Sequence, residues 1–350
     1  MKFSAKCGSL GLVLTMLVAN HPSVAESART FNVPQWTGRT LINAKTKQFE
    51  VCSASSKNEA GIVVTYSVDR RFNWKLSLSS PGWDFIVGHR LRVIVRTGDE
   101  EFRDLAAIAT TANSLEIEVI DAIPFFERLR NNRSMRVQAG GLNWDFPNLE
   151  SGEVMASLVG CVLQQMPRAA RAKTSTAASN KPLNLGPAAD PRSESNAIAA
   201  GVLAQIGVTG VQFVSPGNTF PIGRADAAWR KDTLTGTVAV MADRPWNPET
   251  ITSEILTGSA QPCRGQLFVI AAPATIDRTS ITRSYISCRD ISDVVSAYYL
   301  AVPRAAGGYY QIATIKSGVE FGPRRMAEDL DLRIRDVVIG VIAKHGSTEQ

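Results

Sequence analysis

The stretch Trp74-Lys75-Leu76-Ser77-Leu78 decides the fold class of the first half of the chain. Large apolar side chains alternate with polar ones, and this period of two is typical of a β-strand with one buried and one solvated face. The alternation recurs at residues 90–96 and 115–119. Further strands are predicted at 49–53, 61–68 and 134–137. We therefore predict a mainly β module over residues 30–165.

Two short helices are expected to interrupt these strands. The segment from Pro124 to Arg130 begins with a proline, which suits the first turn of a helix. The segment from Ser151 to Gln164 places Val154, Leu158 and Cys161 along one apolar stripe. Cys161 is therefore expected to face the core from the last element of the module.

The first 25 residues have the features of a cleavable signal peptide. Lys2 and Lys6 precede an apolar run at 10–19, and residues 23–25 (Ser-Val-Ala) form a small-x-small cleavage site. The apolar run is too short to span a bilayer comfortably, and no later segment is long enough either. We expect a periplasmic protein with no transmembrane segment after signal cleavage. Secretion into the medium is the alternative, because a periplasm requires a bacterium with two membranes.

Four cysteines follow the signal, two on each side of a low-complexity stretch. Cys52 lies in the strand predicted at 49–53, and it would join that first strand to Cys161 in the closing helix. Cys263 and Cys288 flank neighbouring ends of two predicted strands. No C-x-x-C or histidine-rich spacing accompanies them, so disulfides are favoured over metal binding or redox chemistry. We expect two structural disulfides, no metal and no cofactor.

Residues 166–195 are dominated by Ala, Ser, Pro, Asn and charged residues, a composition that predicts a flexible linker. An α+β module is predicted over residues 196–346. We expect an antiparallel sheet backed by helices, an α+β sandwich with a long C-terminal helix. The predicted helices lie at 196–206, from 248 onward and at 325–344, and the strands at 211–214, 233–241, 266–271, 280–288, 296–302 and 309–315.

The charge of the chain does not indicate a nucleic-acid partner. The formal net charge is +6, and two of these charges belong to Lys2 and Lys6 of the signal. The remaining excess is spread along the chain, whereas a nucleic-acid interface needs a clustered basic face.

Motifs for catalysis are missing from the sequence. Beyond the signal only His89 and His345 remain, and neither belongs to a nucleophile motif such as G-x-S-x-G or to H-E-x-x-H. Lys316-Ser317-Gly318 has no S-x-x-K to accompany it. Glu116 and Glu118 alternate with apolar residues and are predicted to lie on the solvated face of a strand.

Aromatic residues give the one indication of a binding surface. Pairs of tyrosines lie on two predicted neighbouring strands, and one member of each pair points outward if helices cover only one face of the sheet. Cross-strand packing is the alternative interpretation. The candidate surface in the second module comprises Trp229, Trp246, Tyr298, Tyr299, Tyr309 and Tyr310; Trp74, Trp83 and Trp144 offer similar groups in the first.

The first module resembles a known set of sequences. It opens with Phe49-Glu50-Val51-Cys52-Ser53-Ala54-Ser55 and closes with Leu158-Val159-Gly160-Cys161-Val162. These blocks are similar to the F-x-x-C-x-A-S opening and the L-x-x-C-V closing of a group of uncharacterised exported alphaproteobacterial proteins. The resemblance covers roughly residues 30–165 and implies no catalytic residue. The exported, cysteine-paired β character is also remotely similar to the invasion-associated locus B family, although the W-x-x-x-C opening of that family is not cleanly present.

From these observations we expect a non-catalytic periplasmic envelope protein that binds a protein or peptidoglycan partner. The alternative is a hydrolase-like or ligand-sensing enzyme with an unrecognised site in the C-terminal module.

Overall fold

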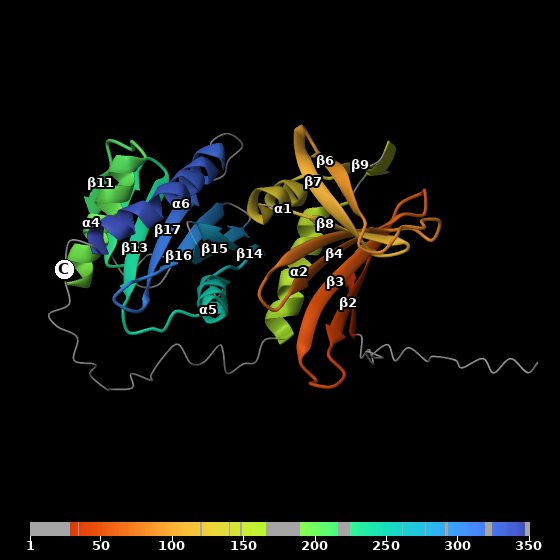
Figure 1. Cartoon of the computed structure of the whole chain (residues 1–350), viewed down its shortest axis with the longest axis horizontal. Coiled ribbons are helices and arrows are strands. Elements are labelled where there is room, and N and C mark those ends of the chain that lie inside the picture. Colours follow the sequence, from red (N-terminus) through yellow and green to blue (C-terminus); the bar gives the residue numbers. More distant parts are fainter. Residues whose placement is uncertain are drawn as a thin grey trace, which may run out of the picture.

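A computed structural model describes residues 29–33, 35–119, 121–139, 141–147, 149–165, 190–215, 225–260, 262–276, 278–290, 293–318 and 324–346. Within these ranges the chain is mainly β, with two antiparallel sheets and five helices (Figure 1). The predicted mainly β character and the antiparallel sheets are thus confirmed. The predicted signal at 1–25 and most of the predicted linker lie outside the described residues.

The N-terminal sheet contains ten strands in the order β1-β2-β3-β4-β5-β8-β7-β6-β9-β10. Buried and half-exposed side chains alternate along it: in β4, for example, Val64, Tyr66 and Val68 are fully buried. The strands are β1 (Arg29–Val33), β2 (Trp36–Ile42), β3 (Phe49–Lys57), β4 (Val63–Asp69), β5 (Trp74–Ser79), β6 (Arg90–Thr97), β7 (Glu100–Thr111), β8 (Ser114–Glu118), β9 (Met135–Ala139) and β10 (Leu142–Phe146).

Within this sheet, strands β1, β2, β7 and β10 are additions to the prediction. In β2 the inward positions after Trp36 are Gly38 and Thr40, so the strand lacks the large apolar alternation that predicts one. The prediction that Cys52 lies in the first strand is therefore wrong. Cys52 lies in β3, and β1 and β2 precede it.

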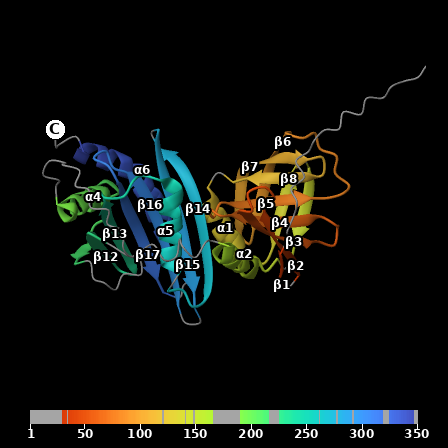
Figure 2. The same ribbon diagram turned by 90° about the horizontal axis from the view of Figure 1, so that it is seen from below.

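Two helices cover the buried face of this sheet. Helix α1 (Ala122–Asn131) and helix α2 (Ser151–Gln165) coincide closely with the predicted segments. Helix α2 packs on β3 and β4, and both helices also contact β14 (Gln266–Ile276) at the edge of the C-terminal sheet. Figures 1 and 2 accordingly show α1 and α2 between the two sheets.

The C-terminal sheet contains seven strands in the order β11-β12-β13-β17-β16-β15-β14. Its other strands are β11 (Gln212–Val214), β12 (Ala227–Lys231), β13 (Leu234–Met241), β15 (Thr279–Arg289), β16 (Val294–Pro303) and β17 (Tyr309–Ser317). The accompanying helices are α4 (Pro191–Gln205), α5 (Pro248–Ala260) and α6 (Arg324–Gly346), and side chains of α6 are described for residues 329–344.

Helix α4 corrects the end of the predicted linker. The helix starts at Pro191, five residues before the predicted module, because the Asp190 side chain accepts a hydrogen bond from the backbone N–H of Arg192 and Pro191 occupies the first turn. Composition alone assigns residues 191–195 to the linker. Only the N-cap Asp190 and the following Pro191 distinguish them from the preceding stretch.

Helices cover both faces of the C-terminal sheet. Helices α4 and α6 pack on β12, β13, β16 and β17, whereas α5 packs on β14 and β15. Neighbouring residues of a strand point to opposite faces. Tyr310 in β17 is bonded to Glu194 of α4, whereas Tyr299 in β16 is bonded to Ser259 of α5. Tyr299 pairs with Ala313, an odd number of residues from Tyr310, so the two tyrosines point to opposite faces and these helices lie on opposite faces. Side chains of both parities are therefore buried along β15, β16 and β17.

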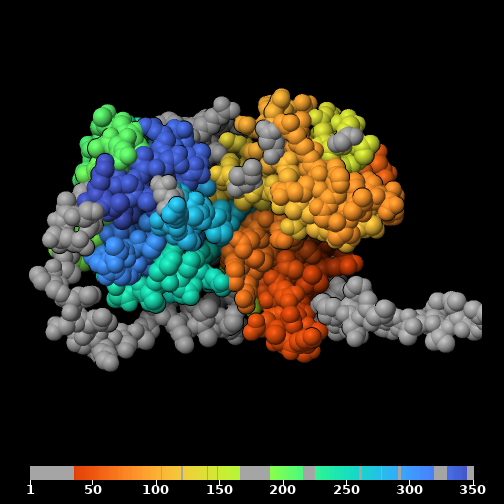
Figure 3. All heavy atoms as spheres, in the orientation of Figure 1, coloured from red at the N-terminus to blue at the C-terminus, as the bar shows by residue number. Residues whose placement is uncertain are grey.

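The two sheets share one buried core. The indole N–H of Trp74 in β5 donates to the carbonyl of Val269 in β14 at 2.6 Å, and the N–H of Ala271 donates to the carbonyl of Phe72 at 3.0 Å. The buried side chains of both sheets form one continuous cluster, and Figure 3 shows the two halves in direct contact. The division at residues 166–195 into two separate domains stays a prediction.

Candidate binding groove

Both predicted disulfides are present. Cys52 in β3 is bonded to Cys161 in α2, with 6.3 Å between their Cα atoms. Cys263, just before β14, is bonded to Cys288 in β15, with a Cα separation of 5.6 Å. Each bond therefore stays within one half of the chain. Disulfides fit a protein that is exported from the reducing cytoplasm.

The aromatic surface predicted in the second module does not form. Trp229, Tyr298, Tyr299, Tyr309 and Tyr310 are each at most 5% exposed. Trp246 is half-buried, and its ring lies edge-on to Tyr309 with a centroid distance of 6.2 Å. The prediction assumed one uncovered face, whereas helices cover both faces of this sheet.

The tyrosine hydroxyls bind carboxylates inside the protein. Tyr285 and Tyr298 donate to Glu127 of α1 at 2.6 and 3.2 Å, and Glu127 is only 3% exposed. Burial and the neighbouring Glu127 charge both raise the pKa of Tyr285, so its hydroxyl remains protonated at neutral pH. Because Glu127 comes from the N-terminal half, these bonds join the two halves of the molecule.

A second carboxylate ties α4 to the C-terminal sheet. Glu194 accepts hydrogen bonds from Arg304 at 2.8 and 2.9 Å and from Tyr310. Burial alone would raise the pKa of Glu194, but the bonds from Arg304 and Tyr310 and the Arg304 charge lower it overall. These aromatic and charged groups hold elements together.

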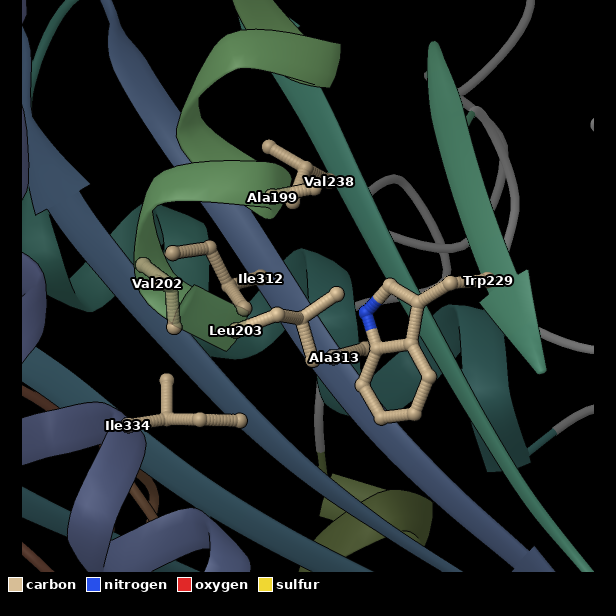
Figure 4. A pocket seen from close by; sticks show the side chains of 8 residues that line it. All are labelled: Ala199, Val202, Leu203, Trp229, Val238, Ile312, Ala313 and Ile334. Atoms are coloured by element: carbon tan, nitrogen blue, oxygen red, sulfur yellow. The ribbon is translucent and has the colours of Figure 1, made fainter. Parts of the chain in front are cut away.

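Trp229 closes a small apolar cavity. Figure 4 shows its ring reaching from β12 toward Leu203 of α4. A Cβ atom at Gly236, its partner across the strands, would lie 1.9 Å from the ring, so glycine leaves the space that the ring fills. The cavity has a volume of about 10 Å³ and holds at most one water molecule.

A shallow groove of about 450 Å³ runs between α6 and the end of β16. Its lining includes Val302, Pro303, Ile339 and Ile342. The one charged group in it, Arg304, is bound to Glu194. This groove therefore offers a mainly apolar surface with few polar groups for recognition.

A larger and more polar groove lies in the N-terminal half, between the β3–β4 turn and β10. Its volume is about 550 Å³, within the usual range for ligand sites. The apolar part of the lining comprises Ala60, Ile62, Val64, Trp144, Phe146, Pro147 and Leu149, and the polar part Gln35, Ser56, Lys57, Asn58, Glu59, Asn143 and Asp145. We call this site the β10 groove.

Local sequence makes one wall of the β10 groove rigid. In the β3–β4 turn the Asn58 side chain accepts a hydrogen bond from the N–H of Ile62 at 2.9 Å. Gly61 has φ of +82° and donates its own N–H to the Asn58 carbonyl. The Asn58 side-chain amide also donates to the backbone carbonyl of Asp145 at 3.1 Å. One residue thus shapes the turn and connects it to the opposite wall.

The polar rim offers groups for a ligand. The Asp145 carboxylate is paired with Arg136 at 2.5 Å. Among the described residues, the side chains of Lys57, Glu59 and Asn143 have no hydrogen-bond or ion-pair partner. The rim therefore presents cationic, anionic and amide side chains around an apolar floor.

Aromatic rings continue the floor outward. The ring of Trp83 lies 4.8 Å from that of Trp144 and 5.3 Å from that of Phe85. Beside them Ile86 and Val87 are 78% and 65% exposed. Of the three tryptophans that the sequence offers in this module, Trp83 and Trp144 thus lie at the groove, whereas Trp74 packs against Phe126 and Phe268 in the core.

The remaining candidate groups do not gather into a catalytic site. His89 is exposed, and the side chain of His345 lies outside the description. Glu116 and Glu118 are bound to Lys75 and Arg90, as expected for a solvated face. In the described part of the chain, no group of three or more His, Cys, Asp or Glu residues is arranged to hold a metal ion.

No helix within the described ranges is both long and apolar enough to cross a membrane. Comparison with models of protein families gives no match, and comparison with curated proteins gives no significant match. The resemblance of residues 30–165 to exported alphaproteobacterial proteins therefore stays a prediction.

Proposed function

We propose that the protein is a non-catalytic binding protein of the bacterial periplasm, exported by the signal at residues 1–25. It binds its partner, a protein or peptidoglycan, in the β10 groove. The observation that carries this proposal is the combination of an apolar floor with the unpaired polar groups of Lys57, Glu59 and Asn143. Pockets that bind ligands typically combine apolar walls with a few polar groups.

An enzymatic or ligand-sensing site in the second half is the alternative. It would need tyrosine, arginine and carboxylate groups that face a cavity. Tyr285, Tyr298 and Glu127 instead bind one another, and none of the three cavities described above includes them. The binding function in the first half is therefore the better supported proposal.

Site-specific photocrosslinking in the native envelope tests the proposal. A photoreactive residue at position 35, an exposed position in the groove lining, is expected to capture a partner. Ala60→Trp fills the groove from an exposed turn position and should abolish the adduct, whereas Ala204→Trp, on the exposed side of α4, should leave it unchanged. Co-sedimentation of the same variants with purified peptidoglycan sacculi tests whether the partner is peptidoglycan. An adduct that persists when Ala60→Trp is added would contradict the proposal. So would the combination of no adduct from the photoreactive protein without Ala60→Trp and no sacculus binding by the wild-type protein.

A further inference from the structure

Strand β10 ends the N-terminal sheet with a free edge. It pairs with β9 on one side, and no strand among the described residues pairs with its other side. The β10 groove lies beside this strand, because residues 143–147 form one of its walls. Unpaired N–H and C=O groups on an edge strand are a template for pairing with another extended chain.

The orientation of the β10 backbone follows from one hydrogen bond. The carbonyl of Asp145 accepts from the side chain of Asn58, which belongs to the opposite wall and not to β9. Backbone groups of a strand point to alternate sides, so those of Asn143, two residues earlier, point to the same side as those of Asp145. Asn143 therefore presents its N–H and C=O toward the groove.

The lining of the groove alternates in the way that an extended peptide requires. Along β10 the side chains of Trp144 and Phe146 are buried on the inner face, and those of Asn143 and Asp145 are exposed on the outer face. Across the groove Ile62 and Val64 continue the inner face, and Lys57 and Glu59 lie on the rim. An added strand would place every second side chain over the apolar floor and the others in solvent.

We propose that β10 receives an extended polypeptide segment of a partner protein as an additional antiparallel or parallel strand. This inference rests on the proposed function and names the ligand class of the same groove. The segment pairs its backbone with Asn143 and carries apolar residues at alternate positions. The Asp145 carbonyl already accepts a hydrogen bond from Asn58, so the segment does not use that carbonyl as an acceptor.

Two substitutions at one position separate backbone pairing from side-chain recognition. Asn143→Pro removes the N–H that faces the groove, and proline is tolerated on edge strands because that N–H is not part of the β9 ladder. Asn143→Ala keeps the N–H and removes only the side-chain amide. The probe is a library of acetylated heptapeptides in which Val, Leu or Phe alternates with Thr, Lys or Glu, measured by fluorescence polarisation.

We expect library members to bind the wild-type protein most tightly and Asn143→Ala more weakly, because Asn143→Ala loses the side-chain amide. Asn143→Pro should bind about tenfold more weakly than Asn143→Ala, since one lost backbone hydrogen bond contributes about that factor. N-methylation of the best peptide at alternate residues should reduce binding at one parity only. This second measurement needs no protein variant, so it holds even if Asn143→Pro fails to fold.

Three results of the peptide measurements would overturn the inference: no library member binding at 1 mM peptide, equal binding by Asn143→Pro and Asn143→Ala, or insensitivity to N-methylation. A dimer of the wild-type protein that Asn143→Pro dissociates would also overturn it, because a second copy would then occupy the edge. Sacculus binding that Ala60→Trp blocks, without peptide binding, would remove this inference and leave the proposed function standing.

Discussion

The two sheets of this protein differ in how many of their faces are covered. In the N-terminal sheet one face packs on α1 and α2 and the other is solvated, and in β4 and β5 buried side chains alternate with more exposed ones. In the C-terminal sheet α4 and α6 cover one face and α5 the other, and its central strands are buried almost continuously. Antiparallel strands can thus have either alternating or continuous burial, and the number of faces that helices cover determines which of the two is found.

The difference also determines where recognition can occur. In a sheet that is covered on both faces, tyrosines and tryptophans are core residues. An aromatic-rich strand in such a sheet therefore indicates core packing and not a binding surface. In the N-terminal sheet, the free edge of β10 and the turn opposite it leave a groove open to solvent. Binding is therefore expected at the edge of the less enclosed sheet.

Removal of the disulfides should have the largest effect and should differ between the halves. Cys52 and Cys161 are 109 residues apart, whereas Cys263 and Cys288 are 25 apart. In the chain-entropy model the free energy of unfolding falls by about 4.7 kcal/mol for the C52A/C161A pair and about 3 kcal/mol for C263A/C288A. Urea unfolding of both double variants measures this, and a larger loss for C263A/C288A would contradict the model.

Adjacent residues of one strand test the covered faces directly. Tyr299 and Leu300 point to opposite faces and are 2% and 1% exposed, so Tyr299→Ala and Leu300→Ala should each lower the free energy of unfolding by about 3 kcal/mol. In β5 only one of two neighbours should matter: Leu76→Ala costs about 3 kcal/mol and Ser77→Ala at most about 0.5. If Tyr299→Ala were as mild as Ser77→Ala, the second sheet would have an open face.

The smallest expected effect is a pH dependence from the C-terminal half. The lowered pKa of Glu194 means that its ionised form stabilises the fold above the pKa of the unfolded chain, and this contribution is lost as the pH falls through the folded pKa. Glu194→Gln should cost about 1 kcal/mol at pH 6, and the difference from wild type should shrink toward pH 3. Chemical unfolding at several pH values measures it. Glu116→Gln on the solvated face is the control, and a difference for Glu194→Gln that does not change with pH would contradict the assignment.

Much of the fold could be predicted because local patterns determine it. The alternation around Leu76, the proline at the start of α5 and the apolar spacing of α2 each identify an element without reference to the rest of the chain. β2 was missed because Gly38 and Thr40 occupy its inward positions, and the start of α4 was missed because its cap lies in a linker-like composition.

The groove could not be predicted in the same way. Asn58 and Asp145, which meet across it, are 87 residues apart. Their approach depends on how ten strands are ordered in space, and no local pattern records that order. The burial of Tyr298 has the same cause, because the Glu127 carboxylate beside its hydroxyl belongs to α1, 171 residues away in the sequence.

The pairing of the cysteines has a consequence for how the chain matures. Three pairings are possible among Cys52, Cys161, Cys263 and Cys288, and this protein joins the first to the second and the third to the fourth. In the proposed export the chain crosses the membrane from its N-terminus, so the first bond can close before Cys263 emerges and the second afterwards. Oxidation of the cysteines in the order in which they emerge therefore gives the native pairs, and no bond needs rearrangement by a disulfide isomerase.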